Sequence, residues 1–226
     1  MANLETQLKK VKSTHLSWPI IWWTFVFALA YSIIRYHLMG GVPWKDFPFF
    51  ILNKAISLSA LILLVINFTL GPLKNLGLGI PNRWLKSRRL VGIVGFIQVF
   101  IHVFMSFILF EPSRYPNYFE ESGTMTLMVG LSLLGGVLAF VSLWMYNVSF
   151  NSNFRKDKDL IEFITSRKVL LISMLFTGSH LFFIGINGWL NPADWNGGMP
   201  PISLVGFTLF LVGYLVNLAG RKDPDG

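Results

Sequence analysis

Residues 90–110 form an apolar run with the sequence LVGIVGFIQVFIHVFMSFILF, which contains no Asp, Glu, Lys or Arg. A helix rises about 1.5 Å per residue, so a run of this length spans about 30 Å, the thickness of the hydrocarbon layer of a bilayer. A helix is the expected form there, because it closes every backbone hydrogen bond within the segment. This run therefore predicts a transmembrane helix.

Five more runs of the same kind lie on either side of it. The six predicted helices cover about 19–39, 49–70, 90–110, 124–146, 169–190 and 201–219. Hydrophobic residues make up 53% of the chain and charged residues only 13%, about half the charged share of a soluble domain. We therefore predict an all-α integral membrane six-helix bundle, with residues 1–226 as a single domain.

The first apolar run is too long for the core of a signal peptide, and no small-residue cleavage site follows it. The N-terminus is therefore expected to be retained. The polar residues 1–17 are expected to hold a short interfacial helix, because apolar residues recur there at helical spacing.

The net charge of +8 is unevenly distributed. If the six runs cross a membrane in turn, 15 of the 19 basic residues fall on one side: Lys9, Lys10, Lys12, Lys74, Arg83, Lys86, Arg88, Arg89, Arg155, Lys156, Lys158, Arg167, Lys168, Arg221 and Lys222. The positive-inside rule assigns that side to the cytoplasm, and with it both termini. The charge thus predicts the orientation of the chain in the membrane, with lipid as the partner, and requires no nucleic acid.

Two histidines stand alone in the apolar centres of the third and fifth predicted helices. His102 lies 13 residues beyond Arg89, and His180 lies 12 beyond Lys168, or about 20 and about 18 Å along a helix. Ionisable groups at membrane depth are costly and usually functional, although a structural hydrogen bond is the simpler alternative. Two imidazoles at one depth predict an axial pair for a haem iron; zinc is less suited, because no third or fourth ligand is near in sequence.

Three residues on the third helix are candidates for supporting this site. Gly95 lies two turns before His102 on the same face, and Gln98 and Ser106 lie four residues to either side of it. The two polar side chains are candidates for hydrogen bonds to the imidazole or to a haem propionate. Small residues also recur on the fourth helix, from Ser132 to Ala139; close helix packing and room for a flat cofactor both remain open.

Other chemistry finds little support. The chain has no cysteine, which excludes disulfides, thiolate metal sites and cysteine nucleophiles. It contains no Walker loop, HExxH motif, dinucleotide fingerprint or Ser-His-Asp pattern. His15 and His37 fall at the predicted water boundary and are assigned interfacial roles.

The segments Asn67–Leu73 (NFTLGPL) and Ser87–His102 (SRRLVGIVGFIQVFIH) resemble the ferric reductase-like transmembrane family. They are most similar to the haem-bearing membrane subunit of the bacterial periplasmic methionine sulfoxide reductase system. The resemblance implies six helices and b-type haem, with ligands at His102 and His180. Two-haem members carry a second histidine 13 or 14 residues earlier on each helix, where this chain has Arg88 and Arg167, so one haem per chain is expected.

These observations lead to one functional hypothesis and two alternatives. We expect an electron-transfer subunit of oxidoreductase type, passing electrons from a quinol or flavin donor to a periplasmic partner or small acceptor, with a quinone or FMN as a possible further cofactor. A haem-free membrane scaffold or small-solute transporter of the same fold is the alternative from another class. A complete ferric reductase is disfavoured, because the family's flavin and nicotinamide domain is missing from this sequence.

Overall fold

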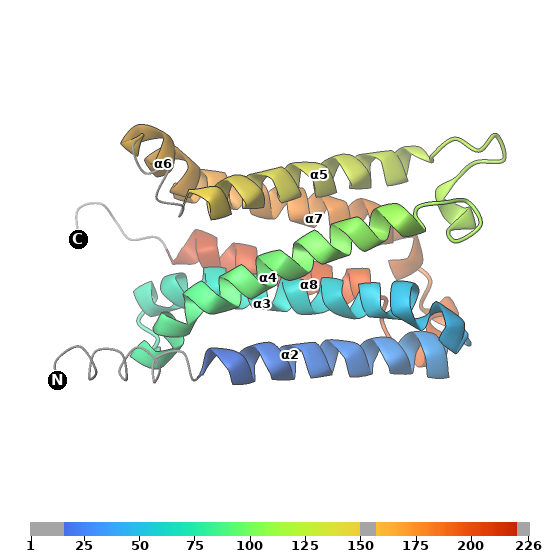
Figure 1. The fold of residues 1–226 in the computed structure, drawn as a ribbon, viewed down its shortest axis with the longest axis horizontal. Helices are drawn as coiled ribbons and strands as arrows, with labels where there is room; N and C mark the ends of the chain where they lie inside the picture. Colours follow the sequence, from blue (N-terminus) through green and yellow to red (C-terminus); the bar gives the residue numbers. More distant parts are fainter. Residues whose placement is uncertain (1–15, 150–156, 221–226) are drawn as a thin grey trace.

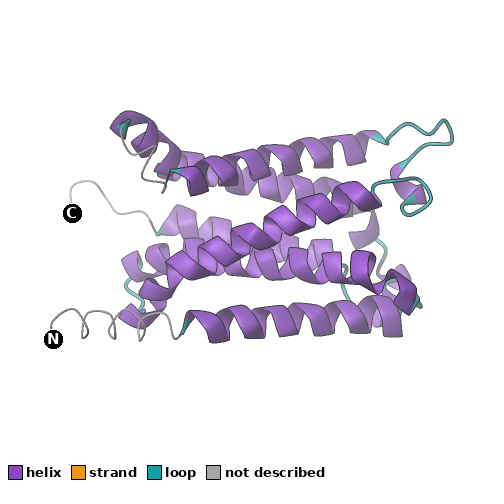
Figure 2. Ribbon diagram, viewed as in Figure 1, coloured by secondary structure: helices purple, strands orange, loops and turns teal. Residues whose placement is uncertain are grey.

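The computed structural model describes residues 16–149 and 157–220. Within these ranges every regular element is helical, and the only β pairing is an isolated antiparallel bridge between Phe119 and Met125. Figure 2 shows helices joined by short loops. The all-α prediction is confirmed, whereas nearly all of the interfacial helix expected in residues 1–17 lies outside the described residues.

Six helical stretches cross the length of the molecule. In chain order the elements are α2 (Ser17–Ser32), η1 (Ile33–Leu38), η2 (Trp44–Asp46), η3 (Phe47–Ile51), α3 (Leu52–Asn75), α4 (Asn82–Leu109), η4 (Pro116–Tyr118), α5 (Leu127–Val148), α6 (Lys158–Thr165), α7 (Arg167–Trp189), η5 (Pro192–Asp194), η6 (Asn196–Gly198) and α8 (Ile202–Ala219).

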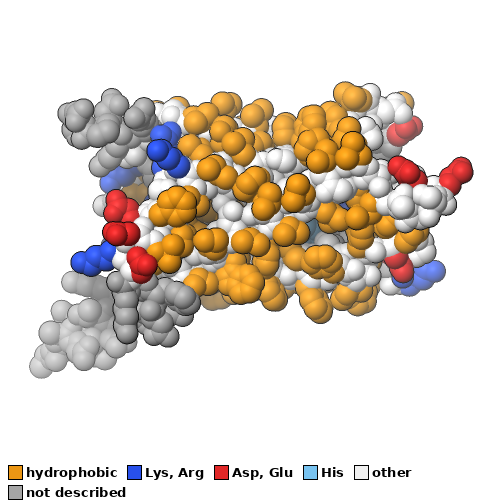
Figure 3. All heavy atoms as spheres, turned by 90° about the horizontal axis from the view of Figure 1, so that it is seen from above, with side chains coloured by type: hydrophobic (Ala, Val, Ile, Leu, Met, Phe, Trp, Pro, Cys, Tyr) orange, Lys and Arg blue, Asp and Glu red, His pale blue; other side chains and the backbone are white. Residues whose placement is uncertain are grey.

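Among the described residues, six helical stretches, some of them made of consecutive elements, are long and apolar enough to cross a membrane. Figure 3 shows an apolar band around the middle of one face, with charged side chains gathered at the two ends. That distribution is expected of a surface in contact with lipid, because charged groups are costly within the hydrocarbon layer. The chain is therefore a multi-pass membrane protein.

Helix α3 is the central helix of the bundle. In the span Trp44–Asn75, which contains α3, half of the residues of the most apolar segment are buried, compared with 17% of those in α4. Helix α3 packs against α2, α4 and α8. Helix α5 packs closely against α7, and α7 against α8, but α4 touches α5 only sparsely. Figure 1 shows α4 crossing the bundle between α3 and the α5–α7 pair, and it shows that α2 begins and α8 ends at the same end as α6.

The third membrane helix is longer than the sequence predicts. Helix α4 begins at Asn82, directly after Pro81, so four basic residues assigned to a loop belong to the helix: Arg83, Lys86, Arg88 and Arg89. The prediction followed the apolar run, which ends where the charges begin. Lysine and arginine are good helix formers, so the helix continues past the hydrophobic boundary.

Candidate functional site

His102 is held by a side chain from the neighbouring helix. Its Nδ1 lies 2.7 Å from Oδ1 of Asn53 on α3, and Nδ2 of Asn53 donates to Oγ of Ser106 at 3.1 Å. The Ser106 hydroxyl is itself 3.4 Å from Nδ1 of His102. Because the amide of Asn53 uses its nitrogen on Ser106, its oxygen is left to accept the proton of Nδ1.

His180 has a comparable arrangement with α5. Its Nδ1 lies 3.0 Å from both the hydroxyl and the backbone carbonyl of Ser132. The Ser132 hydroxyl donates its single proton to the carbonyl oxygen of His180 at 2.9 Å. Both oxygen atoms that face Nδ1 are therefore acceptors, and Nδ1 carries the proton.

The two rings thus share one tautomer. Neutral imidazole protonated at Nδ1 has its lone pair on Nε2. None of the hydrogen bonds within the described part of the chain uses Nε2 of either ring. Metal-binding histidines usually have this arrangement, with the second ring nitrogen donating to a neighbouring oxygen.

The two histidines lie at a similar depth in the bundle. His102 comes seven residues before the end of α4, and His180 nine before the end of α7, or about 10 and about 14 Å from the same end. Both side chains are half-buried. Helix α4 has few contacts with α5 and α7, so each histidine takes its hydrogen-bond partner from another helix, α3 for His102 and α5 for His180.

The other predicted site residues have different surroundings. Gly95 packs against α3, since a Cβ there would lie 3.3 Å from atoms of Leu63 and Leu64. Oε1 of Gln98 is buried and has no hydrogen-bond partner among the described residues. Ser106 therefore lies directly beside His102, Gly95 takes part in helix packing, and Gln98 retains an acceptor that a ligand or a water molecule would satisfy.

Small residues on α5 allow this helix to pack closely against His180 on α7. A Cβ at Gly136 would lie 2.9 Å from Nδ1 of His180, and one at Gly135 would lie 3.0 Å from its backbone nitrogen. A larger residue at either position would push the imidazole away from Ser132. The small-residue run on this helix thus serves close packing, and that packing positions the histidine.

The donor set suits haem better than a bare metal ion. No group of three or more His, Cys, Asp or Glu side chains that could bind a metal occurs in residues 16–149 and 157–220. Zinc sites need three or four protein ligands, whereas haem brings four nitrogens of its own and needs only axial ligands. Two neutral imidazoles with available Nε2 atoms are the donors that a bis-histidine haem would require.

The arginines at the positions of a second histidine pair are engaged in helix packing. Nε of Arg88 donates to the carbonyl of Asn67 on α3 at 2.9 Å. Nη2 of Arg167 donates to the last carbonyls of α8, those of Asn217 at 2.7 Å and Leu218 at 3.0 Å. Arg167 thus satisfies carbonyls at the end of α8, whereas Arg88 ties α4 to a carbonyl within α3, and neither guanidinium group can serve as a haem ligand.

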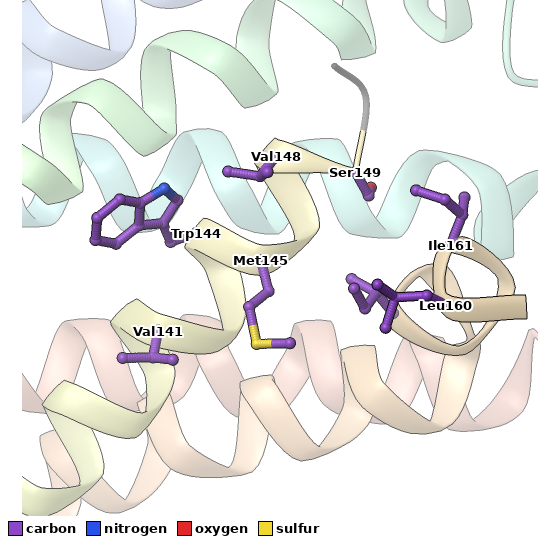
Figure 4. Close-up of a pocket in the computed structure, with 8 residues that line it drawn as sticks. Val141, Trp144, Met145, Val148, Ser149, Leu160 and Ile161 are labelled. Atoms are coloured by element: carbon purple, nitrogen blue, oxygen red, sulfur yellow. The ribbon is translucent and has the colours of Figure 1, made fainter. Parts of the chain in front are cut away.

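An apolar hollow lies between α5 and α6, away from the histidines. Figure 4 shows side chains of both helices around it, including Trp144, Met145 and Leu160. Trp144 follows Ser132 by 12 residues on α5, or about 18 Å. The hollow is thus at the opposite end of the bundle, and the histidine pair is not part of it.

In comparisons with known proteins, no family model matches this chain, and no curated protein matches its sequence.

The sequence identified Ser106 beside His102 but not the partners that the two histidines have on other helices. Asn53 is buried in the first turn of α3, and Ser132 is buried in α5. An asparagine within an apolar run is a usable signal, because a buried amide needs a partner. No local pattern connects Asn53 with His102 or Ser132 with His180, since each pair is separated by about 50 positions.

Proposed function

We propose that this chain is a single-haem, b-type electron-transfer protein of the bacterial inner membrane, similar to the ferric reductase-like transmembrane family. The observation that supports it best is the matched pair of imidazoles, each with Nδ1 bonded to an oxygen acceptor and Nε2 unengaged. Bound haem would supply a one-electron couple between ferric and ferrous iron.

The residues of the chain would have defined roles around that group. His102 and His180 would give their Nε2 lone pairs to the iron from α4 and α7, and Asn53 and Ser132 hold the two rings in the required tautomer. The surrounding apolar helices keep water from the pair, and a low dielectric favours neutral imidazoles over charged ones. Arg88 and Arg167, bonded to helix carbonyls, leave one axial pair per chain.

The direction of electron flow follows from charge and depth. The basic side chains concentrate at the end of the bundle where α2 begins, which the positive-inside rule assigns to the cytoplasm. The histidines lie nearer the other end, so electrons would leave towards a periplasmic partner or a small acceptor. The sequence holds no dinucleotide fingerprint, so a quinol or a separate flavin carrier such as FMN would be the donor.

Stopped-flow absorbance in proteoliposomes tests this function. We expect a quinol analogue, or FMN with an added flavin reductase, to reduce the haem, and a membrane-impermeant oxidant to reoxidise it from the side opposite the basic loops. NADH or NADPH alone should give no rapid reduction. Rapid reduction by either nicotinamide without a partner would contradict the proposed donor, and a purified protein without haem would favour the scaffold or transporter.

A further inference from the structure

Lys54 places an ammonium group within a membrane span, with no counter-ion among the residues that the structure describes. It belongs to the span Trp44–Asn75 and is half-buried. Its Nζ lies 5.4 Å from the centroid of the Phe50 ring and 5.5 Å from that of Tyr115. No ion pair or hydrogen bond joins this ammonium to another residue in the described part of the chain. Such a cation is costly in a membrane span and usually marks function.

The neighbouring groups do not neutralise it. The carboxylates of Asp46 and Glu111 pair with Arg114, at 2.7 and 3.4 Å. Burial raises the pKa of Tyr115 to about 12, so its phenol stays uncharged at neutral pH beside Lys54. Two aromatic faces attract a cation, but they bring no negative charge.

A second cation increases the imbalance. Arg35 is only 6% exposed, and its Nε is buried without a hydrogen-bond partner in the described chain. Its guanidinium group lies 5.5 Å from the ring of Tyr36, which in turn packs 5.6 Å from the Phe50 ring beside Lys54. One guanidinium nitrogen of Arg35 donates to the backbone carbonyl of Met199. This carbonyl is uncharged and therefore cannot offset the positive charge of Arg35. Two cations without a counter-charge in the described part of the chain favour an anion beside them, because a buried unpaired charge is costly.

The location of Lys54 indicates what that anion is. Lys54 directly follows Asn53 on α3, and Oδ1 of Asn53 lies 2.7 Å from Nδ1 of His102, so the same turn of the helix carries the partner of the imidazole and the unpaired ammonium. Haem carries two carboxylates on one edge. Resting on the haem assignment above, we propose that Lys54 binds a carboxylate, and that this carboxylate is a propionate of the haem held by His102 and His180.

Haem titration with a modified haem tests the proposal. The full-length protein, prepared without haem, is titrated with haem b and with its dimethyl ester, which lacks the propionate charges. Dissociation constants from absorbance are compared for wild type, Lys54→Met and the control Lys45→Met, which removes an exposed lysine from the same end. We expect Lys54→Met to weaken haem b binding about tenfold, as for a charge-assisted hydrogen bond. Lys45→Met should have no effect, and Lys54→Met should bind the dimethyl ester as wild type does.

Each other outcome contradicts a specific part of the proposal. Equal weakening for both haems would show that Lys54 only supports the fold, and unchanged haem b affinity would show that it binds no propionate. A spectral change on adding succinate to the haem-loaded wild type, abolished in Lys54→Met, would assign the site to a diffusible carboxylate instead. If the wild type binds haem with a bis-imidazole spectrum, a negative result for Lys54 contradicts only the propionate contact and leaves the proposed function intact. If the wild type binds no haem, the propionate contact and the proposed function are both contradicted.

Discussion

At the scale of single residues, the proposed function depends on which nitrogen of each imidazole carries the proton. Asn53 and Ser132 present oxygen acceptors to Nδ1 of His102 and His180. A hydrogen bond of this kind fixes ring orientation as well as tautomer. In the proposed haem protein it would orient the two Nε2 atoms before the haem binds, which would reduce the ordering cost of binding.

Asn53→Ala should weaken haem binding, because Nδ1 of His102 then retains only the Ser106 hydroxyl at 3.4 Å. Loss of such a partner usually costs about 10- to 100-fold in metal affinity. The measurement is a haem titration followed by absorbance. Asn75→Ala is the matched control, an asparagine on the same helix whose side chain bonds the carbonyl of Gly220 instead. Wild-type affinity in Asn53→Ala would contradict the assigned role.

At the scale of helices, close approach through glycine holds the bundle together. Helix–helix contacts in membranes rely on small residues, because lipid removes the hydrophobic driving force between helices. At Gly178 on α7, a Cβ would lie 2.4 Å from two ring atoms of Phe210 on α8. Phe210 is buried, so its ring has little room to move.

Gly178→Ala should therefore destabilise the protein by about 1–3 kcal/mol, the usual cost of overpacking. Gly130→Ala on α5 is the control, because a Cβ there meets nothing within 4 Å, and alanine is the better helix former. Unfolding by SDS in mixed micelles measures both variants. Equal stability of Gly178→Ala and Gly130→Ala would show that the α7–α8 contact adapts more easily than we infer.

At the scale of the whole molecule, hydropathy is sufficient to predict six spans but not how they pair. Every predicted run corresponds to a helix, because the bilayer imposes both length and apolarity. The start of α4 differs by eight residues, because hydropathy marks the lipid boundary and not the end of a helix. The histidines were found from their cost in an apolar run, whereas their partners on α3 and α5 depend on tertiary packing, which local patterns do not encode.

Reporter fusions test the predicted orientation. Asn117, between α4 and α5, and Asn196, between α7 and α8, should both be periplasmic, whereas a fusion at Gly79, between α3 and α4, should be cytoplasmic. The reason is the positive-inside rule applied to the basic residues near Gly79. A cytoplasmic signal at Asn117 or Asn196 would overturn the orientation, and with it the proposed outward electron flow.

The central claim is that His102 and His180 bind one haem between them. The most direct measurement is a pyridine haemochrome assay with an absorbance spectrum of the purified protein. We expect about one b-type haem per chain, because one axial pair binds one iron, and a low-spin spectrum that His102→Ala and His180→Ala each abolish. His37→Ala should retain it, since His37 bonds the carbonyl of Val42 in its own loop. A low-spin spectrum that persists in both His102→Ala and His180→Ala, or wild-type protein without haem, would contradict the claim.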